Sequence, residues 1–223
     1  MKRSEINNHI KEALAFFKDH RFHLPEWAQW SVQKWKEEPE VSARIKSLQM
    51  GWDITDFGTG DFYDTGLILF CMRNGLVSNK KSKPYAEKIM IVEENQKTPW
   101  HYHSFKEEDI INRGGGNLIV ELAHTNKDDE LDLEREVQVS IDEIQHTFKP
   151  KEKIYIKPGQ SITLTQKMYH TFYGEAGCGK VLTGEVSRVN DDNTDNRFLT
   201  APKRFAEIVE DEDVLYPLWS ELP

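Results

Sequence analysis

Two histidines one residue apart, His101 and His103, are the side chains of this sequence best suited to chemistry. In a β-strand, residues i and i+2 point to the same face, so both imidazoles would project together into the interior of a barrel. Their nitrogens could then reach one metal ion at about 2.0–2.2 Å. Glu108, several residues on and across a turn, fits as a carboxylate ligand from the same segment, with Glu107 as its nearest competitor.

A metal inside a barrel also needs a ligand from an opposing strand, and His170 is the best candidate. It follows Pro158 and Gly159, which predict a turn between strands. Three imidazoles and one carboxylate leave one or two exchangeable positions on the ion, which is typical of a catalytic site, because structural metal sites are closed. Since no thiolate is available, the plausible ions are manganese, zinc, iron, cobalt and nickel. The alternative is that these histidines are barrel residues that hold no metal.

Residues 1–50 predict a helical extension. Ser4 can cap a first helix, and a second helix is predicted between Pro25 and Pro39. Its tryptophans are expected to pack on the main domain or on a second subunit. The apolar stripe of the first helix is Ile6, Ile10, Ala13, Leu14 and Phe17, and the tryptophans are Trp27, Trp30 and Trp35.

Residues 51–200 predict a mainly β domain, a sandwich or barrel, because short β-branched and aromatic runs alternate with Gly, Asn, Asp and Lys clusters. No alternating βαβ series is present in the sequence, which disfavours a doubly wound sheet. Residues 201–223 are expected to pack on the barrel, with a helix in 201–218 that turns Phe205, Ile208 and Val209 inward. The predicted strands are 66–72, 88–92, 117–122, 131–141, 153–157, 161–165 and 180–189.

Composition and charge exclude several classes of protein. The 223 residues carry a formal net charge of −9, which repels phosphate backbones and anionic membrane surfaces, so we expect no nucleic-acid or membrane partner. No run approaches the about 18 apolar residues that a membrane span needs, and the N-terminus lacks a secretory signal. Cys71 and Cys178 form no CxxC pair and are expected to be reduced, which indicates a cytoplasmic protein.

The motifs resemble those of a known superfamily. His101-x-His103-x4-Glu108 resembles the first cupin motif, and the Pro-Gly turn with His170 resembles the second, although more residues than usual separate the glycine from the histidine. Almost the whole chain is similar to the D-lyxose isomerase family. The shared segments are the tryptophan-rich start, 108–116 (EDIINRGGG), 184–187 (GEVS), 190–192 (NDD) and 195–198 (DNRF).

This resemblance implies a cupin-type β-barrel (jelly roll) with an N-terminal helical extension. It implies a manganese-dependent isomerase that interconverts D-lyxose with D-xylulose, and usually D-mannose with D-fructose, and that is commonly a homodimer. It also implies that His101, His103, Glu108 and His170 are the metal ligands and that Lys106 lies in the substrate pocket.

An aldose–ketose isomerase needs a base that carries a proton between C1 and C2 and an acid that protonates oxygen. Glu185, in a β-like run, suits the base if it points inward, but it could equally pair with Arg188 or Arg197. Lys106 could donate to the developing oxyanion or shuttle protons, unless it is an exposed turn lysine. Both are therefore candidate catalytic residues.

The polar loop that follows residue 189 offers candidate sugar ligands. Asp191, Asp192 and Asp195 could bind sugar hydroxyls by charge-assisted hydrogen bonds, or simply form Asx turns. Arg197 could anchor that loop. Two other functions stay open on the sequence alone: an iron-dependent cupin dioxygenase, which would use the same open metal shell, and a non-catalytic sugar-binding barrel.

Overall fold

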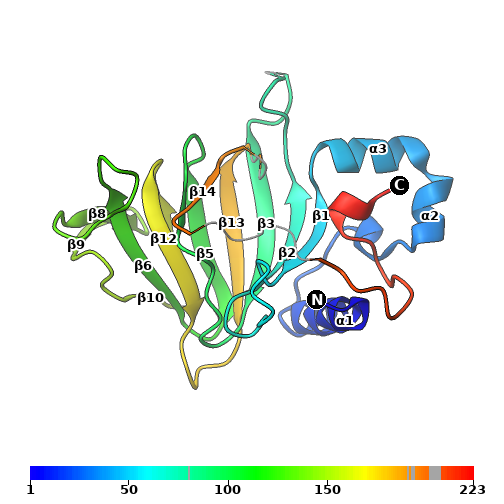
Figure 1. Cartoon of the computed structure of the whole chain (residues 1–223), viewed down its shortest axis with the longest axis horizontal. Helices are drawn as coiled ribbons and strands as arrows, with labels where there is room; N and C mark the ends of the chain where they lie inside the picture. Colours follow the sequence, from blue (N-terminus) through cyan, green and yellow to red (C-terminus); the bar gives the residue numbers. More distant parts are fainter. Residues whose placement is uncertain (80, 190, 192–193, 201–206) are drawn as a thin grey trace.

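The computed structural model describes residues 1–79, 81–189, 191, 194–200 and 207–223. The three α-helices lie at one end of the molecule, beside β1 and β2, and the strands curl into two facing antiparallel sheets (Figure 1). The helical elements are α1 (Arg3–Asp19), η1 (Glu26–Gln29), α2 (Val32–Glu37), α3 (Pro39–Ser47) and η2 (Trp219–Glu221). The strands are β1 (Gly51–Thr55), β2 (Leu67–Arg73), β3 (Tyr85–Val92), β4 (His101–His103), β5 (Glu108–Gly115), β6 (Leu118–Thr125), β7 (Leu131–Asp132), β8 (Val137–Ile141), β9 (Ile144–Phe148), β10 (Ile154–Ile156), β11 (Ser161–Leu164), β12 (Met168–Gly174), β13 (Val181–Arg188) and β14 (Asn196–Phe198).

The two sheets enclose one core. The larger sheet has the strand order β1-β2-β3-β13-β5-β11-β8-β9, and the smaller has the order β10-β6-β12-β4-β14. Inward side chains of both sheets, such as Met90, Ile110 and Val120, form one cluster of buried residues. A fully buried side chain of this kind contributes about 1.5–3 kcal/mol relative to an exposed one. The space between the sheets is therefore a packed interior, and β4, β5, β12 and β13 reach into it from both sides.

Strand β2 is apolar on both faces because each face is covered. Alternate residues of a strand point to opposite faces, so its two sets of side chains enter two different cores. One set packs between the sheets, and the other packs under α1, against Ile6, Ile10 and Phe17. The first set is Leu67, Leu69 and Cys71, and the second is Ile68, Phe70 and Met72. The uninterrupted run LILFCM is the sequence signature of this double burial.

The chain's last described segment is fastened to α1. Arg3 is fully buried and forms ion pairs with Glu210 (2.8 Å) and Glu221. The backbone N–H of Arg3 donates to the carbonyl oxygen of Val209 at 2.9 Å. Further along, Trp52 of β1 forms a parallel bridge with Leu218. The residues after 206 therefore hold the helical end against the larger sheet.

Two predictions about the helical elements need correction. Helix α1 begins at Arg3, with Lys2 at the N-cap, and Ser4 donates instead to Asp211 at 2.8 Å. Pro39 does not only end a helix: α2 ends at Glu37, and Pro39 opens α3, where its missing N–H costs nothing. The tryptophans pack within the chain itself, since Trp35 is buried and Trp27 and Trp30 lie against the same core.

The helix expected in 201–218 is wrong over the residues that the structure describes. Residues 207–218 contain no helix; the backbone of Val209 bonds to Met1 and Arg3, and Leu218 bridges to Trp52 of β1. Val209 is 60% exposed, and Ile208 is only partly buried. Phe205 lies outside the described residues. Each predicted strand overlaps an observed one, but the run 131–141 is two short strands, β7 and β8.

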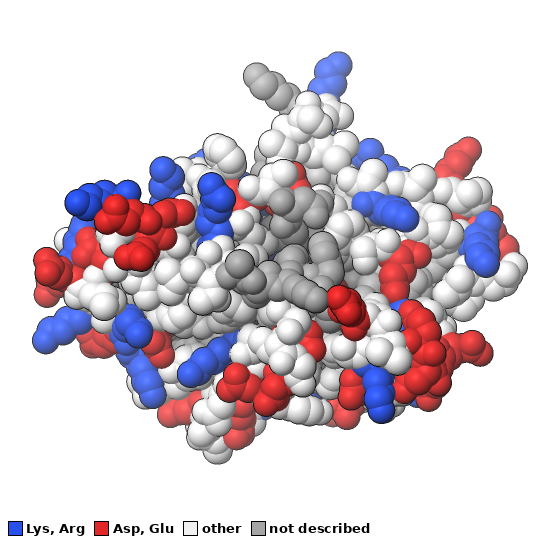
Figure 2. Space-filling view, viewed as in Figure 1, with Lys and Arg blue, Asp and Glu red and all other residues white. Residues whose placement is uncertain are grey.

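Charge is spread over the surface. Figure 2 shows lysine and arginine side chains interspersed with aspartate and glutamate on the visible face. None of the described helices is both long enough and apolar enough to cross a membrane. Cys71 is buried, Cys178 is exposed, and the two are not bonded to each other.

Candidate active site

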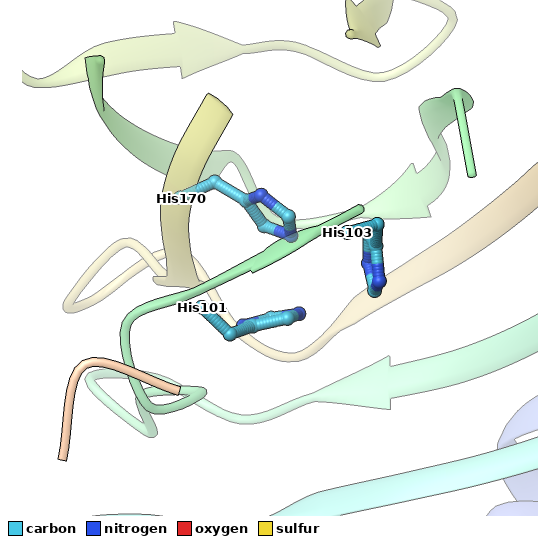
Figure 3. A group of neighbouring side chains, drawn as sticks. All are labelled: His101, His103 and His170. Carbon is cyan, nitrogen blue, oxygen red and sulfur yellow. The ribbon is translucent and has the colours of Figure 1, made fainter. Parts of the chain in front are cut away.

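Three histidines meet where β4 and β12 pair. His101 and His103 are two residues apart on β4 and share a face, and His170 on β12 is the register partner of His101. The ring centroids of His101 and His170 lie 4.2 Å apart, and those of His103 and His170 lie 5.4 Å apart. One nitrogen from each ring lies within 4.8 Å of the others, and the three rings converge in Figure 3. The structure therefore brings together the three histidines that the sequence analysis selected.

The hydrogen bonds of these rings fix which nitrogen is available. Nδ1 of His101 donates to the carbonyl oxygen of Pro99 at 2.8 Å, and Nδ1 of His170 donates to that of Met168 at 3.0 Å. A carbonyl can only accept, so Nδ1 carries the proton and Nε2 presents a lone pair. Nε2 of His170 is buried and accepts no hydrogen bond among the described residues. Burial lowers the pKa of His170 to about 4 and holds that of His101 well below its usual range, so both rings are neutral at pH 7.

Glu108 completes this group from the facing sheet. It is the first residue of β5, and its Oε1 lies 3.4 Å from Nε2 of His103 and 3.3 Å from Nε2 of His170. Burial raises the pKa of Glu108, but Lys106 and then His103 outweigh it and hold that pKa well below the usual range. An ionised carboxylate beside the neutral imidazoles of His101 and His170, with a buried lone pair left over on His170, fits a divalent cation.

A second charged group adjoins the first. Nζ of Lys106 lies 2.6 Å from Oε2 of Glu108 and 2.9 Å from Oε1 of Glu185. Glu185 on β13 also accepts a hydrogen bond from Oγ of Ser187 at 2.9 Å. Nζ of Lys88 lies 3.4 Å from Oε1 of Glu185. Glu185 therefore points inward, and its partners are Lys106 and Lys88. It does not pair with Arg188, which contacts Glu107 at 3.1 Å on the surface.

Lys88 is the charged residue of this site that the sequence analysis missed. It is buried on β3, opposite Glu185 in the register of β3 with β13. Its signal was present in the sequence, because Lys88 alternates with Met90 and Val92, which both face the core between the sheets. A lysine in phase with inward apolar residues indicates a paired charge inside the barrel.

Most of these groups line one cavity that opens to solvent, with His170 outside its lining. The polar lining consists of His101, His103, Glu108, Glu185, Lys88 and Lys106, together with Thr98 and Asn196. The rest of the lining is apolar and is called the apolar wall here. Its members are Phe57, Leu67, Leu69, Met90, Ile110, Phe172 and Phe198. A small polyol in this cavity would meet both charged groups and the apolar wall.

Two predicted sugar-binding residues lie elsewhere. Arg197 is exposed, because it alternates on β14 with Asn196 and Phe198, which line the cavity. Asp191 accepts a hydrogen bond from Gln49 at 3.1 Å and lies outside the cavity lining. Strand alternation thus turns Arg197 away from the cavity, and Asp191 instead contacts Gln49, which is 142 residues away in the sequence. Asp192 lies outside the described residues.

The family model for D-lyxose isomerase matches residues 1–222. The chain belongs to the D-lyxose isomerase family. The chain is 45% identical to a relative in this family, the D-lyxose/D-mannose isomerase of Serratia proteamaculans, over 98% of this chain and 95% of that protein. It is 43% identical to the D-lyxose/D-mannose isomerase of Escherichia coli O157:H7, over 99% of this chain and 98% of that protein.

Solved structures give the same fold for this family member. A variant of the L-ribose isomerase of Acinetobacter sp. DL28, in complex with L-ribose, matches with a TM-score of 0.62 at 14% identity, over 94% of this chain and 98% of that one. The ligand-free L-ribose isomerase of Cellulomonas parahominis matches with a TM-score of 0.61 at 14% identity, over the same shares. The predicted fold class, a cupin-type β-barrel with helices at its N-terminus, is confirmed.

These matches also confirm the class of enzyme. Identity above 40% over nearly the whole length of both chains places this family member among the sugar isomerases. Three close histidines in such an enzyme could bind a metal ion. The identity of the metal, the preferred sugar and the residues that carry the reaction are matters of proposal.

Proposed function

We propose that this protein interconverts D-lyxose with D-xylulose, and D-mannose with D-fructose, with the help of a divalent metal ion, most plausibly Mn²⁺. One observation carries the proposal: His101, His103 and Glu108, which are grouped with His170, line the same cavity as the buried pair Lys106–Glu185. The names of the two relatives support the choice of sugars.

His101, His103 and His170 would hold the ion through Nε2, and Glu108 would add a carboxylate oxygen. When bound, such an ion polarises a carbonyl and stabilises negative charge on a neighbouring oxygen. The two backbone carbonyls that accept from Nδ1 keep His101 and His170 in the tautomer and orientation that binding needs. The protein therefore supplies a prearranged donor set without a thiolate, which suits Mn²⁺ as well as Zn²⁺, Co²⁺, Fe²⁺ or Ni²⁺.

The proton is moved by Glu185 in this proposal. Its carboxylate takes a proton from one of the two adjacent sugar carbons and returns it to the other. Lys106, whose Nζ lies 2.9 Å from this base, gives a proton to the oxygen that changes from carbonyl to hydroxyl and regains one from the neighbouring hydroxyl as that group becomes the carbonyl. Lys88 faces Glu185 from the other side and helps to fix the carboxylate. Acid and base are thus adjacent within one cavity, as an exchange of carbonyl and hydroxyl requires.

The apolar wall has a separate role. Phe57, Phe172 and Phe198 exclude water from part of the cavity and give the sugar's C–H face a surface to pack on. Exclusion of water strengthens the electrostatic interactions of the charged groups in the same cavity.

The proposal is tested by removing the metal and then one ligand. Protein stripped with chelator should lose interconversion of D-lyxose and D-mannose and regain it with a single divalent ion, measured by chromatography. His170→Ala should abolish turnover and lower bound metal while the barrel stays folded, since the ring contributes one of three converging nitrogens. His146→Ala, at an exposed position of β9, is the matched control and should leave both unchanged.

Unchanged turnover and metal content in His170→Ala would reject the assignment. Consumption of oxygen with iron, without sugar interconversion, would indicate a dioxygenase instead. Retention of sugar without turnover would indicate a binding protein.

The homodimer and the cytoplasmic location inferred from the sequence stay predictions. The mass of the protein in solution, measured by light scattering during gel filtration, tests the first of them.

A further inference from the structure

Asp195 joins two segments of the cavity that are far apart in the sequence. Its carboxylate is buried, at 5% exposed, immediately before β14. Oδ1 accepts a hydrogen bond from the backbone N–H of Phe105 at 2.8 Å, and Oδ2 accepts one from the N–H of Lys106 at 3.0 Å. The backbone carbonyl of Asp195 accepts a third, from the N–H of Ser104 at 3.2 Å. Three consecutive backbone donors are thus bound by one residue.

The segment held in this way is the short turn between β4 and β5. It begins after His103 and ends at Glu108, so it joins a strand of the smaller sheet to a strand of the larger one. Lys106 stands within it, and its side chain is almost fully buried between Glu108 and Glu185. A lysine has a long flexible side chain, so the placement of its ammonium depends on how firmly its backbone is held.

The other segment is the strand at the edge of the cavity. Strand β14 pairs only with β4 among the described strands, through three residue pairs. Its first and last residues, Asn196 and Phe198, line the cavity, and the ring of Phe198 lies 5.4 Å from that of His101. The carboxylate of Asp195 is the link between this strand and the turn that carries Lys106.

We propose that Asp195 is a positioning residue of the isomerase. It holds β14 against the 104–106 turn and thereby sets the position of the Lys106 ammonium relative to Glu185. The proposal rests on the function proposed above and extends it. Both carboxylate oxygens already accept backbone N–H groups, so Asp195 serves the backbone, whereas a sugar ligand would present a free oxygen to the cavity. Charge-assisted hydrogen bonds of this kind are roughly twice as strong as neutral ones, which suits a residue that holds two segments together.

The first test compares substitutions at Asp195 with a matched control. Asp195→Ala removes both acceptors, and Asp195→Asn leaves one amide oxygen that can still accept. We expect kcat per bound metal to fall about tenfold or more in Asp195→Ala and less in Asp195→Asn, because a shift of about 1 Å in a catalytic group can cost of the order of 10²-fold. KM and metal content should stay near those of the wild type. Asp132→Ala also removes a carboxylate that accepts two backbone N–H groups, but far from the cavity, and should leave kcat unchanged.

A double-mutant cycle then separates positioning from general stability. If Asp195 acts through Lys106, Asp195→Ala should have no further effect on kcat in a Lys106→Met background. A further tenfold loss in the double variant would overturn the proposal, and so would a wild-type kcat in Asp195→Ala.

Hydrogen exchange gives a readout that does not depend on turnover. The amides of residues 104–106 should exchange faster in Asp195→Ala than in the wild type, while those of β6 should not change. Unchanged exchange at 104–106 would overturn the proposed positioning role of Asp195, whatever the enzyme's substrate. A wild-type protein that interconverts no sugar would overturn the proposed function, and the exchange experiment would still decide whether Asp195 holds the turn.

Discussion

Glu185→Gln is the substitution that tests the proton transfer most directly. Glutamine has the shape of glutamate, and its Oε1 can still accept from Oγ of Ser187 and from Nζ of Lys106, both at 2.9 Å in the structure. The change therefore removes the proton-accepting carboxylate while leaving most of its contacts. The three histidines and Glu108 are untouched, so bound metal should remain at the wild-type level.

The expected size of the effect follows from the role of the carboxylate. A positioned general base contributes about 10²–10⁴-fold to the rate. At about 1.36 kcal/mol for each factor of ten, this is a loss of about 2.7–5.4 kcal/mol of transition-state stabilisation. Because Glu185 lies at the reacting end of the cavity and the apolar wall stays intact, KM should change far less than kcat.

The assay follows conversion of D-lyxose in D₂O, with deuterium in the product measured by mass spectrometry. Transfer through a carboxylate that exchanges with solvent predicts deuterium at C1 or C2, and Glu185→Gln should lower turnover and deuterium uptake together. Glu121→Gln is the matched control, because Glu121 accepts one hydrogen bond from Tyr173 at 2.7 Å outside the cavity lining. Turnover within a few-fold of the wild type in a fully metal-loaded Glu185→Gln enzyme would refute the role of Glu185 as the base.

Three further predictions concern stability. Arg3→Met should lower the free energy of unfolding by about 1.5–3 kcal/mol in urea titrations, because it removes the charge-assisted hydrogen bonds of a buried guanidinium with the partly exposed Glu210 and Glu221; a midpoint unchanged from the wild type would contradict this. Burial raises the pKa of Tyr102 to about 12, so the folded state favours the neutral phenol. The stabilisation from this phenol is therefore complete below pH 10 and is lost as the pH rises towards 12. Urea midpoints measured at pH 8 and at pH 11 should differ less from each other in Tyr102→Phe than in the wild type. Gly159→Ala should lower the free energy of unfolding by about 1–2 kcal/mol because of the positive φ alone. Gly115→Ala should lower it further, since the new Cβ would lie 2.2 Å from the carbonyl oxygen of Lys180. Equal urea midpoints for the two variants would contradict this difference.

Three of the four candidate metal ligands could be predicted from the sequence because their relation is local. His101 and His103 share a face by the two-residue period of a strand, and Glu108 follows after one turn. His170 needed a second strand beside the first, and the family motif supplied that pairing. The structure confirms that the three histidines are neighbours, with His170 opposite His101.

The rest of the site depends on relations that the sequence does not contain. Lys88 faces Glu185 only because β3 pairs with β13, nearly one hundred residues later, in one particular register. Asp195 is bound to backbone N–H groups 89 and 90 residues away, and any residue type carries such a donor. Arg197 was expected near the sugar, but β14 is a strand, and strand alternation turns this side chain outward.

The double burial of β2 has a consequence for how the larger sheet finds its alignment. If that strand slid by one residue, apolar side chains would replace apolar side chains in both cores, so polarity alone gives it little protection against misalignment. Its neighbour β3 is different, because the same slide would move the ammonium of Lys88 away from Glu185 and beneath α1, among the aliphatic and aromatic side chains of that core. Lys88, which lines the cavity, therefore also favours the native register of β3 over a register shifted by one residue.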